Sequence, residues 1–213
     1  MWSRGRPVNK DFILAAILEI RRESTFDFEV LNNLFTADLD LVYLRTNLND
    51  VNWERLIAKI NPAFSDRIII TVSAQEFKQK SDLIKHWKEA ERKDYQPDML
   101  PSDMVYSTSV HYLTDILDLP ACFRYVFYSP VFPSISKPGY NPQISLITLK
   151  QDLEKLRKKN AELPQIIALG GVQAENVKKV KDTGFNGVAL MGALWQVDDP
   201  VRAFKEIKKA LIS

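Results

Sequence analysis

Two glycine-containing turns in the C-terminal part of the chain are suited to hold an anion. Gly170 and Gly171 follow the apolar run 165–169, and Gly192 follows the run 187–191. A glycine pair lets backbone N–H groups approach an anion because no Cβ stands in the way. Gly192 is placed to start a short helix whose first amides face the same anion. We expect a phosphate group between the two turns; the alternative is that all three are ordinary turn glycines.

A proline-framed stretch, residues 128–140, offers hydroxyl groups and a cation. Ser134, Ser136 and Lys137 lie within it. Prolines stiffen a loop by fixing φ, and a lysine ammonium is a compact charge that suits a diphosphate or another charged leaving group. The alternative is a surface crossover that ends in an exposed lysine.

The chain contains two histidines, His86 and His111. An imidazole titrates close to neutral pH, so a histidine at the end of a strand is a candidate for moving a proton. His111 follows a predicted strand and is that candidate. A packing or helix-capping role is the alternative for this side chain.

These candidate residues can act together only if the ends of the strands that carry them lie close in space. The sequence contains eight short apolar runs that alternate with helical patterns, as in a parallel sheet. The predicted strands are residues 13–20, 39–44, 67–72, 83–87, 104–107, 125–128, 165–169 and 187–191. Several runs are continuously apolar, which is typical of strands covered on both faces. The predicted helices are residues 28–37, 53–60, 149–158, 174–182 and 200–211, with their lysines on an outer, solvated stripe.

This alternation predicts an α/β fold, a single (β/α)8 TIM barrel that forms one domain over residues 1–213. In such a barrel the loops after the strands build the active site, and those after strands seven and eight often hold a phosphate. Residues 75–103 are polar and charged and carry two prolines. We expect irregular structure there, with the fourth strand the least defined.

Composition and charge narrow the class of protein. Hydrophobic residues make up 46% and charged residues 26% of the chain, as in soluble globular proteins, and the net charge of +2 is too small for a nucleic-acid surface. The lone Cys122 excludes an intrachain disulfide and favours a reducing, cytoplasmic location. The apolar run 12–18 follows positive charge but is short and lacks a cleavage site, so we expect no signal peptide. No run reaches the roughly 18 apolar residues of a membrane helix.

Four segments, taken in order, carry a resemblance to a known family. They are Ser107-Thr108-Ser109-Val110-His111, residues 125–137, Ala168-Leu169-Gly170-Gly171-Val172 and residues 187–193. Their order resembles the signature of thiamine-phosphate synthases and the related TenI proteins. Arg45, in the run 39–45, resembles the family arginine that reaches the substrate phosphates, and His86 stands at the place of a family histidine.

The resemblance implies a set of site residues. Gly170, Gly171, Met191 and Gly192 would hold the thiazole phosphate, largely through backbone amides. Arg45 would also bind phosphate, and Ser109, Ser134, Ser136 and Lys137 would face the diphosphate of hydroxymethylpyrimidine diphosphate. In the synthase, diphosphate leaves the pyrimidine methylene and the thiazole nitrogen captures the resulting cation, so charge neutralisation matters more than a base.

The chain departs from the synthase pattern at the metal site. The family aspartate after strand three, which holds Mg²⁺, is replaced by residues 70–74, which contain no carboxylate, and a family lysine is replaced by Asn47. Glu91 is the candidate for a second metal ligand. Mg²⁺ binds through carboxylates and phosphate oxygens together, so diphosphate activation should be weaker without the first.

Three functions follow from these residues. The first is a synthase that needs Mg²⁺ and joins two phosphate-ester substrates. The second is a TenI-like thiazole tautomerase that needs no metal and uses His111 to move the proton. The third is a barrel that binds thiazole phosphate without catalysis. Should the resemblance fail, the alternative is another phosphate-binding barrel, such as a ribulose-phosphate epimerase or a tryptophan-pathway enzyme.

Overall fold

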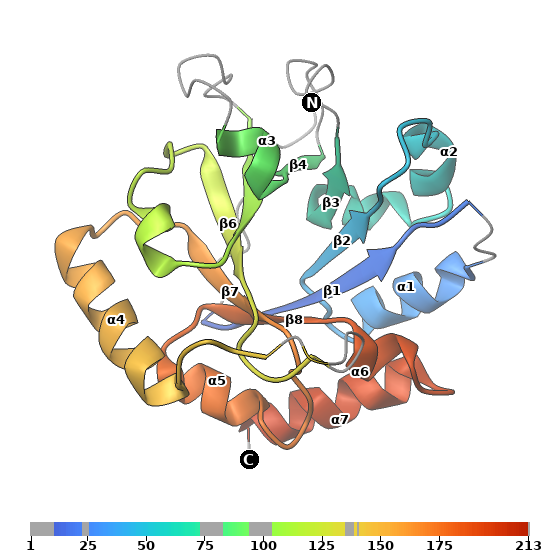
Figure 1. The fold of residues 1–213 in the computed structure, drawn as a ribbon. Coiled ribbons are helices and arrows are strands. Elements are labelled where there is room, and N and C mark those ends of the chain that lie inside the picture. The colour runs from blue at the N-terminus through green and yellow to red at the C-terminus, as the bar shows by residue number, and fades with distance from the viewer. Residues whose placement is uncertain are drawn as a thin grey trace.

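The computed structural model describes residues 11–22, 26–72, 83–93, 104–134, 139 and 141–212. Eight parallel strands form a closed barrel in chain order (Figure 1). The strands are β1 (Ile13–Glu19), β2 (Leu41–Arg45), β3 (Ile68–Thr71), β4 (Ile84–Trp87), β5 (Tyr106–Val110), β6 (Phe123–Tyr128), β7 (Gln165–Leu169) and β8 (Gly187–Leu190). The predicted (β/α)8 barrel is therefore confirmed.

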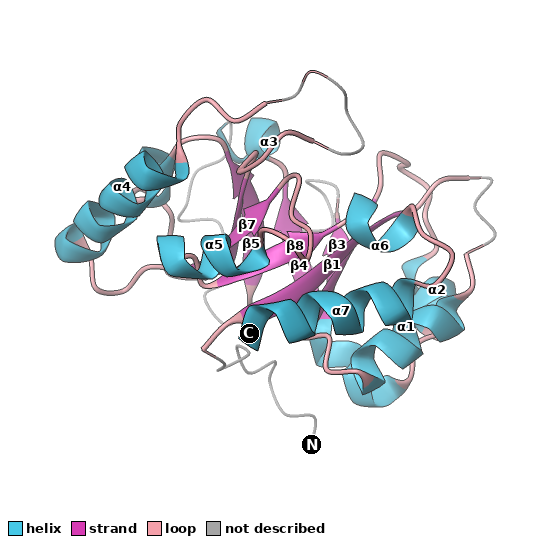
Figure 2. Ribbon diagram, turned by 90° about the horizontal axis from the view of Figure 1, so that it is seen from below, coloured by secondary structure: helices cyan, strands magenta, loops and turns pink. Residues whose placement is uncertain are grey.

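The helices surround this barrel unevenly. The α-helices are α1 (Phe28–Thr36), α2 (Trp53–Ile57), α3 (Glu89–Lys93), α4 (Leu146–Lys159), α5 (Val177–Thr183), α6 (Gly192–Trp195) and α7 (Pro200–Ile212), and the described 3₁₀ helices are η1 (Pro62–Arg67) and η3 (Leu113–Ile116). Helices α4, α5, α7 and α1 pack one against the next around one side. Figure 2 shows α1 and α7 side by side beneath the strands. No helix in the described part of the chain is long and apolar enough to cross a membrane.

The core has two layers because the strands alternate their side chains between two faces. In β1, Ile13, Ala15 and Ile17 point into the barrel, where they meet residues such as Phe127. Leu14, Ala16 and Leu18 of the same strand join the larger cluster between the barrel and the helices. Since both faces of β1 are apolar and buried, this strand reads as a continuous apolar run.

Close contacts between β1 and β8 complete the barrel. Ile13 pairs with Gly187, and the Ile13 N–H donates to the Asn186 carbonyl at 2.8 Å. A Cβ on Gly187 would lie 2.7 Å from the Cβ of Ile13, so only glycine lets the two strands approach this closely. The buried Asp40 carboxylate accepts the Leu14 N–H at 2.9 Å and ties the start of β2 to β1.

Several predicted elements differ in their bounds. The fifth strand was expected at residues 104–107 and lies at Tyr106–Val110, which includes Thr108 and Ser109. Helix α4 begins three residues before the predicted start, because the Ser145 hydroxyl accepts the Thr148 N–H and caps it. Within residues 75–103, where irregular structure was expected, the predicted fourth strand is present as β4, and α3 follows it in the described part.

Candidate functional site

A cavity of about 1040 Å³ opens at the carboxyl ends of the strands. Every strand except β3 and β6 contributes a described lining residue, from the strand itself or from the loop that follows it. The described residues that line it are Ile17, Leu18, Glu19, Arg21, Phe26, Tyr43, Arg45, Asn47, His86, Lys88, Glu89, Ser109, His111, Leu169, Met191, Gly192, Trp195 and Gln196. The sequence-predicted residues Arg45, Ser109, His111, Met191 and Gly192 are thus brought together in one cavity.

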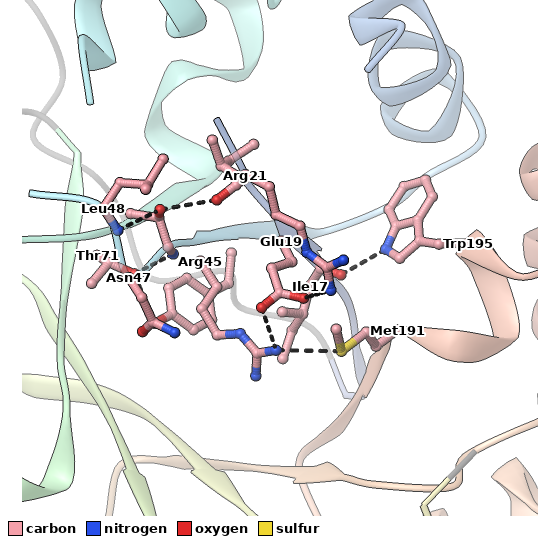
Figure 3. A network of polar contacts seen from close by, with 12 residues as sticks. Ile17, Glu19, Arg21, Arg45, Asn47, Leu48, Thr71, Met191 and Trp195 are labelled. Carbon is pink, nitrogen blue, oxygen red and sulfur yellow. Dashed lines mark hydrogen bonds and ion pairs between the residues drawn. The ribbon is translucent and has the colours of Figure 1, made fainter. Parts of the chain in front are cut away.

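The wall formed by β1, β2 and β8 carries an ionic network (Figure 3). The Glu19 carboxylate lies 2.7 Å from Arg21 and 3.6 Å from Arg45, both measured to the guanidinium Nη2. The same Nη2 of Arg45 lies 3.9 Å from the sulfur of Met191. Arg45 therefore stands beside the predicted phosphate turn, and an anion that binds it has to compete with Glu19.

Tyr43 is held at the base of the cavity by Thr71. The two hydroxyls are 3.0 Å apart, and the Thr71 hydroxyl also accepts the Thr46 N–H at 3.1 Å. Burial raises the pKa of Tyr43 to about 12, so its phenol stays protonated. The end of β3, where the synthase pattern has a carboxylate, thus serves to fix β2.

His86 lies between two serine hydroxyls of β5. Ser107 Oγ is 3.0 Å from its Nδ1 and Ser109 Oγ is 3.2 Å from its Nε2, while the ring stacks on Tyr43 with centroids 4.3 Å apart. Burial, with a smaller effect of the cations Lys88 and Arg45, lowers the pKa of His86 to about 3. The ring is therefore neutral and can donate to one serine and accept from the other.

His111 occupies a different environment, at the rim of the cavity. Its Nδ1 lies 2.7 Å from the carbonyl oxygen of Ser129, and its Nε2 lies 3.6 Å from Oε2 of Glu89. The His111 side chain is 45% exposed, against 18% for Glu89. Of the two histidines, His111 is the one that an incoming ligand can reach.

The two glycine turns end neighbouring strands, since Leu169 of β7 pairs with Ala189 of β8. Gly192 lines the cavity and starts α6, as expected. Gly170 and Gly171 have φ of +101° and +66°, and their missing side chains make room for Pro130 and Phe132. In the described part of the site these two glycines therefore pack against the loop after β6.

Hydrogen bonds hold this glycine turn in place. The Phe132 N–H donates to the Gly170 carbonyl at 3.1 Å. The Asn176 side-chain amide donates to the Gly171 carbonyl and its oxygen accepts the Gln173 N–H, each at 2.9 Å. The turn is thus fixed from both sides before any ligand binds.

Other predicted site residues lie elsewhere. Ser136 and Lys137 are outside the described residues, and Ser134 ends the described part of its loop. Glu91 is on α3 but does not line the cavity, although its Oε2 is buried without a hydrogen-bond partner among the described residues. Its role as a metal ligand stays a prediction.

The donor set decides whether the described residues fit Mg²⁺. Across the described ranges, no three His, Cys, Asp or Glu side chains are grouped closely enough to share a metal ion. The carboxylates in the cavity face cationic or imidazole groups: Glu19 faces Arg21 and Arg45, and Glu89 faces His111. These described residues therefore do not fit a Mg²⁺ ion.

Sequence reasoning missed several residues of the cavity. Glu19 and Arg21 follow the first apolar run, and Lys88 and Glu89 follow the fourth. Their position in the sequence could have identified them as cavity residues, because charged residues just after barrel strands lie at the catalytic end of the barrel. Trp195 was also missed; its indole N–H donates to the Ile17 carbonyl at 2.6 Å and links α6 to β1 (Figure 3).

Comparisons with known proteins identify similar sequences and similar folds. Residues 95–194 match the family model described as thiamine monophosphate synthase. Over 98 residues the chain is 37% identical to thiamine-phosphate synthase of Streptococcus suis, covering 46% of this chain and 39% of that protein. Over 83 residues it is 31% identical to the Bacteroides fragilis synthase, covering 39% and 40%. The matched segment thus spans about two-fifths of the length of these curated relatives.

The structural similarity covers more of the chain than the sequence similarity does. A crystal structure titled thiamine phosphate pyrophosphorylase from Bacteroides thetaiotaomicron superimposes with a TM-score of 0.69 at 21% identity, covering 93% of this chain and 97% of that one. The corresponding protein from Pyrococcus furiosus gives 0.65 at 14% identity, covering 95% and 96%. At these identities the superpositions show the fold alone. The sequence match confirms the resemblance, because residues 95–194 match the thiamine monophosphate synthase family model.

Proposed function

We propose that the chain is a thiamine-biosynthesis enzyme that binds thiazole phosphate and joins it to hydroxymethylpyrimidine diphosphate with release of diphosphate. The observation that carries this proposal is the cavity at the strand ends, where Arg21, Arg45 and Lys88 share one space with Gly192. Cations fixed at a barrel mouth suit ligands that carry phosphate groups. The relatives named above are synthases, which supports the same reaction.

The proposed reaction depends mainly on positive charge that the protein places beside the leaving group. The bond from the pyrimidine methylene to the diphosphate oxygen breaks, and the thiazole nitrogen forms the new bond to that carbon. Negative charge grows on the leaving diphosphate, so cations held in position lower the barrier. We assign this role to Lys137 and to the cations that line the cavity, and the thiazole phosphate to Arg45, Met191 and Gly192.

A second candidate activity is the tautomerisation of thiazole carboxylate phosphate. The observation that favours it is His111, whose Nε2 lies on the cavity rim beside Glu89. This reaction moves a proton, and an exposed imidazole is the natural carrier. It needs no diphosphate leaving group and no metal ion.

One experiment tests both activities. The protein is incubated with thiazole phosphate and hydroxymethylpyrimidine diphosphate, with Mg²⁺ or with a chelator, and separately with thiazole carboxylate phosphate alone, and products are followed by mass and NMR. We expect thiamine phosphate and diphosphate from the first mixture, and loss of both products in Lys137→Ala. Isomerisation in the second mixture that disappears in His111→Ala would identify the tautomerase. Tight binding without turnover contradicts both activities and indicates a binding protein.

A further inference from the structure

The cationic wall of the main cavity contains an acidic side chain, Glu19. This residue ends β1 and is the register partner of Arg45, which ends β2. Both side chains lie on the strand face that also carries the barrel-interior residues Ile17 and Tyr43, and both line the cavity. The Glu19 carboxylate therefore shares with Arg45 the space in which we place a ligand phosphate.

The two carboxylate oxygens of Glu19 contact different guanidinium groups. Nη2 of Arg21 donates a hydrogen bond to Oε2 at 2.7 Å, and Nη2 of Arg45 lies 3.6 Å from Oε1 (Figure 3). The Arg21 side chain is 74% exposed, whereas those of Glu19 and Arg45 are 27% and 28% exposed, so water screens the inner contact less. One carboxylate therefore bridges two arginines and offsets part of the charge of both.

We propose that Glu19 is a specificity-determining residue that makes this wall of the cavity accept a single phosphate group in preference to a diphosphate. A diphosphate has two linked phosphoryl groups, which can engage two neighbouring guanidinium groups at once. The Glu19 carboxylate occupies the bridging position between the same two arginines, so a diphosphate has to displace it or bind beside a like charge. The inference deepens the proposed function and rests on it.

A single phosphate group meets less competition on this wall. It needs only Arg45, whose Nη2 lies 3.9 Å from the sulfur of Met191, and the hydrogen bond between Glu19 and Arg21 can stay in place. Specificity then comes from a repulsive group placed against one ligand as well as from contacts with the other. The leaving diphosphate is left to cations beyond this wall, such as Lys88 after β4.

The contact distances favour competition with anions over a purely orienting role for Glu19. At 3.6 Å, the separation between Glu19 and Arg45 is longer than a hydrogen bond, so the carboxylate acts on this guanidinium mainly through its charge. Glu19→Gln removes that charge and keeps the shape of the side chain. If the carboxylate competes with anions, this substitution strengthens their binding; if it only orients Arg45, the substitution weakens their binding.

Calorimetric titrations with inorganic diphosphate and with thiazole phosphate, each at low ionic strength with a chelator present, separate these roles. We expect Glu19→Gln to bind diphosphate about tenfold more tightly than the parent, and thiazole phosphate less than about threefold more tightly. The double variant Glu19→Gln/Arg21→Ala should lose this gain, because diphosphate again finds one guanidinium group. Glu206→Gln, which removes the carboxylate from an exposed pair with Arg202 on α7, is the matched control and should bind both ligands as the parent does.

The diphosphate titrations decide the role of Glu19 by themselves. Retention of the gain in the double variant would indicate a general effect of charge and overturn the inference. Unchanged or weaker diphosphate binding in Glu19→Gln would also overturn it, as would equal tightening of both ligands. A parent that does not bind thiazole phosphate contradicts the proposed function instead.

Discussion

Arg45 is the side chain on which anion binding should depend most. Its guanidinium lies between Glu19 and the sulfur of Met191, so it is oriented toward the turn where we propose that the phosphate binds (Figure 3). Hydrogen bonds to charged groups contribute roughly 1.5–3 kcal/mol. We expect Arg45→Ala to weaken thiazole phosphate binding by about tenfold or more in calorimetric titrations. Arg124 is exposed on the outer face of β6, and the control Arg124→Ala should leave the affinity unchanged. Equal affinity in both variants would contradict the placement of the phosphate.

The buried His86 should make the protein sensitive to acid. Its pKa is about 3 in the folded chain, while an unfolded histidine titrates near its ordinary 6.5. Between these values the unfolded state binds the proton and the folded state does not, so the free energy of unfolding falls as the pH falls.

The slope should approach about 1 kcal/mol per pH unit near pH 5 and be reduced in His86→Gln, which can still bond both serines. Urea unfolding between pH 4 and pH 7 measures it. Identical slopes for the parent and His86→Gln would argue against a buried neutral ring.

At the scale of elements, the turn after β7 and the loop after β6 depend on each other. A Cβ on Gly171 would lie 2.6 Å from the Cβ of Phe132, and the φ of +66° disfavours any other residue. We expect Gly171→Ala to destabilise the protein by about 2–4 kcal/mol, from backbone strain and overpacking together, as measured by urea unfolding. Gly184→Ala also has positive φ but meets only the end of the Arg157 side chain, so it should cost less. The reverse order would contradict the tight packing of this turn.

The elements were predictable where apolar residues form continuous runs. The existence of all eight strands and of most helices follows from this pattern. The glycine residues at the strand ends predicted the turns there and the short helix that begins at Gly192. The fifth strand was placed too early because Ser107 and Thr108 are buried polar residues, which an apolar pattern passes over. The ring contacts of His86 and the pairing of His111 with Glu89 were not predictable, because they depend on how three strands pack beside one another.

At the scale of the whole molecule, the barrel depends on the β1–β8 contact. Gly187→Ala would push β8 away from Ile13, and overpacking of this kind costs about 1–3 kcal/mol. Hydrogen exchange should show lost protection concentrated in β1 and β8, with β5 and β6 as the internal control. Uniform loss of protection over all strands would show that the contact is not a local point of closure.

The adjacency of β1 and β8 also has a consequence for synthesis on the ribosome. β1 gains its second neighbour only when β8 has left the exit tunnel, more than 160 residues after β1. Until then, the edge of β1 that later pairs with β8 exposes unpaired N–H and C=O groups. Until β8 has emerged, the nascent chain therefore exposes an unpaired strand edge that can pair with other chains. A holding chaperone that binds this segment would have its largest effect before residue 190 emerges.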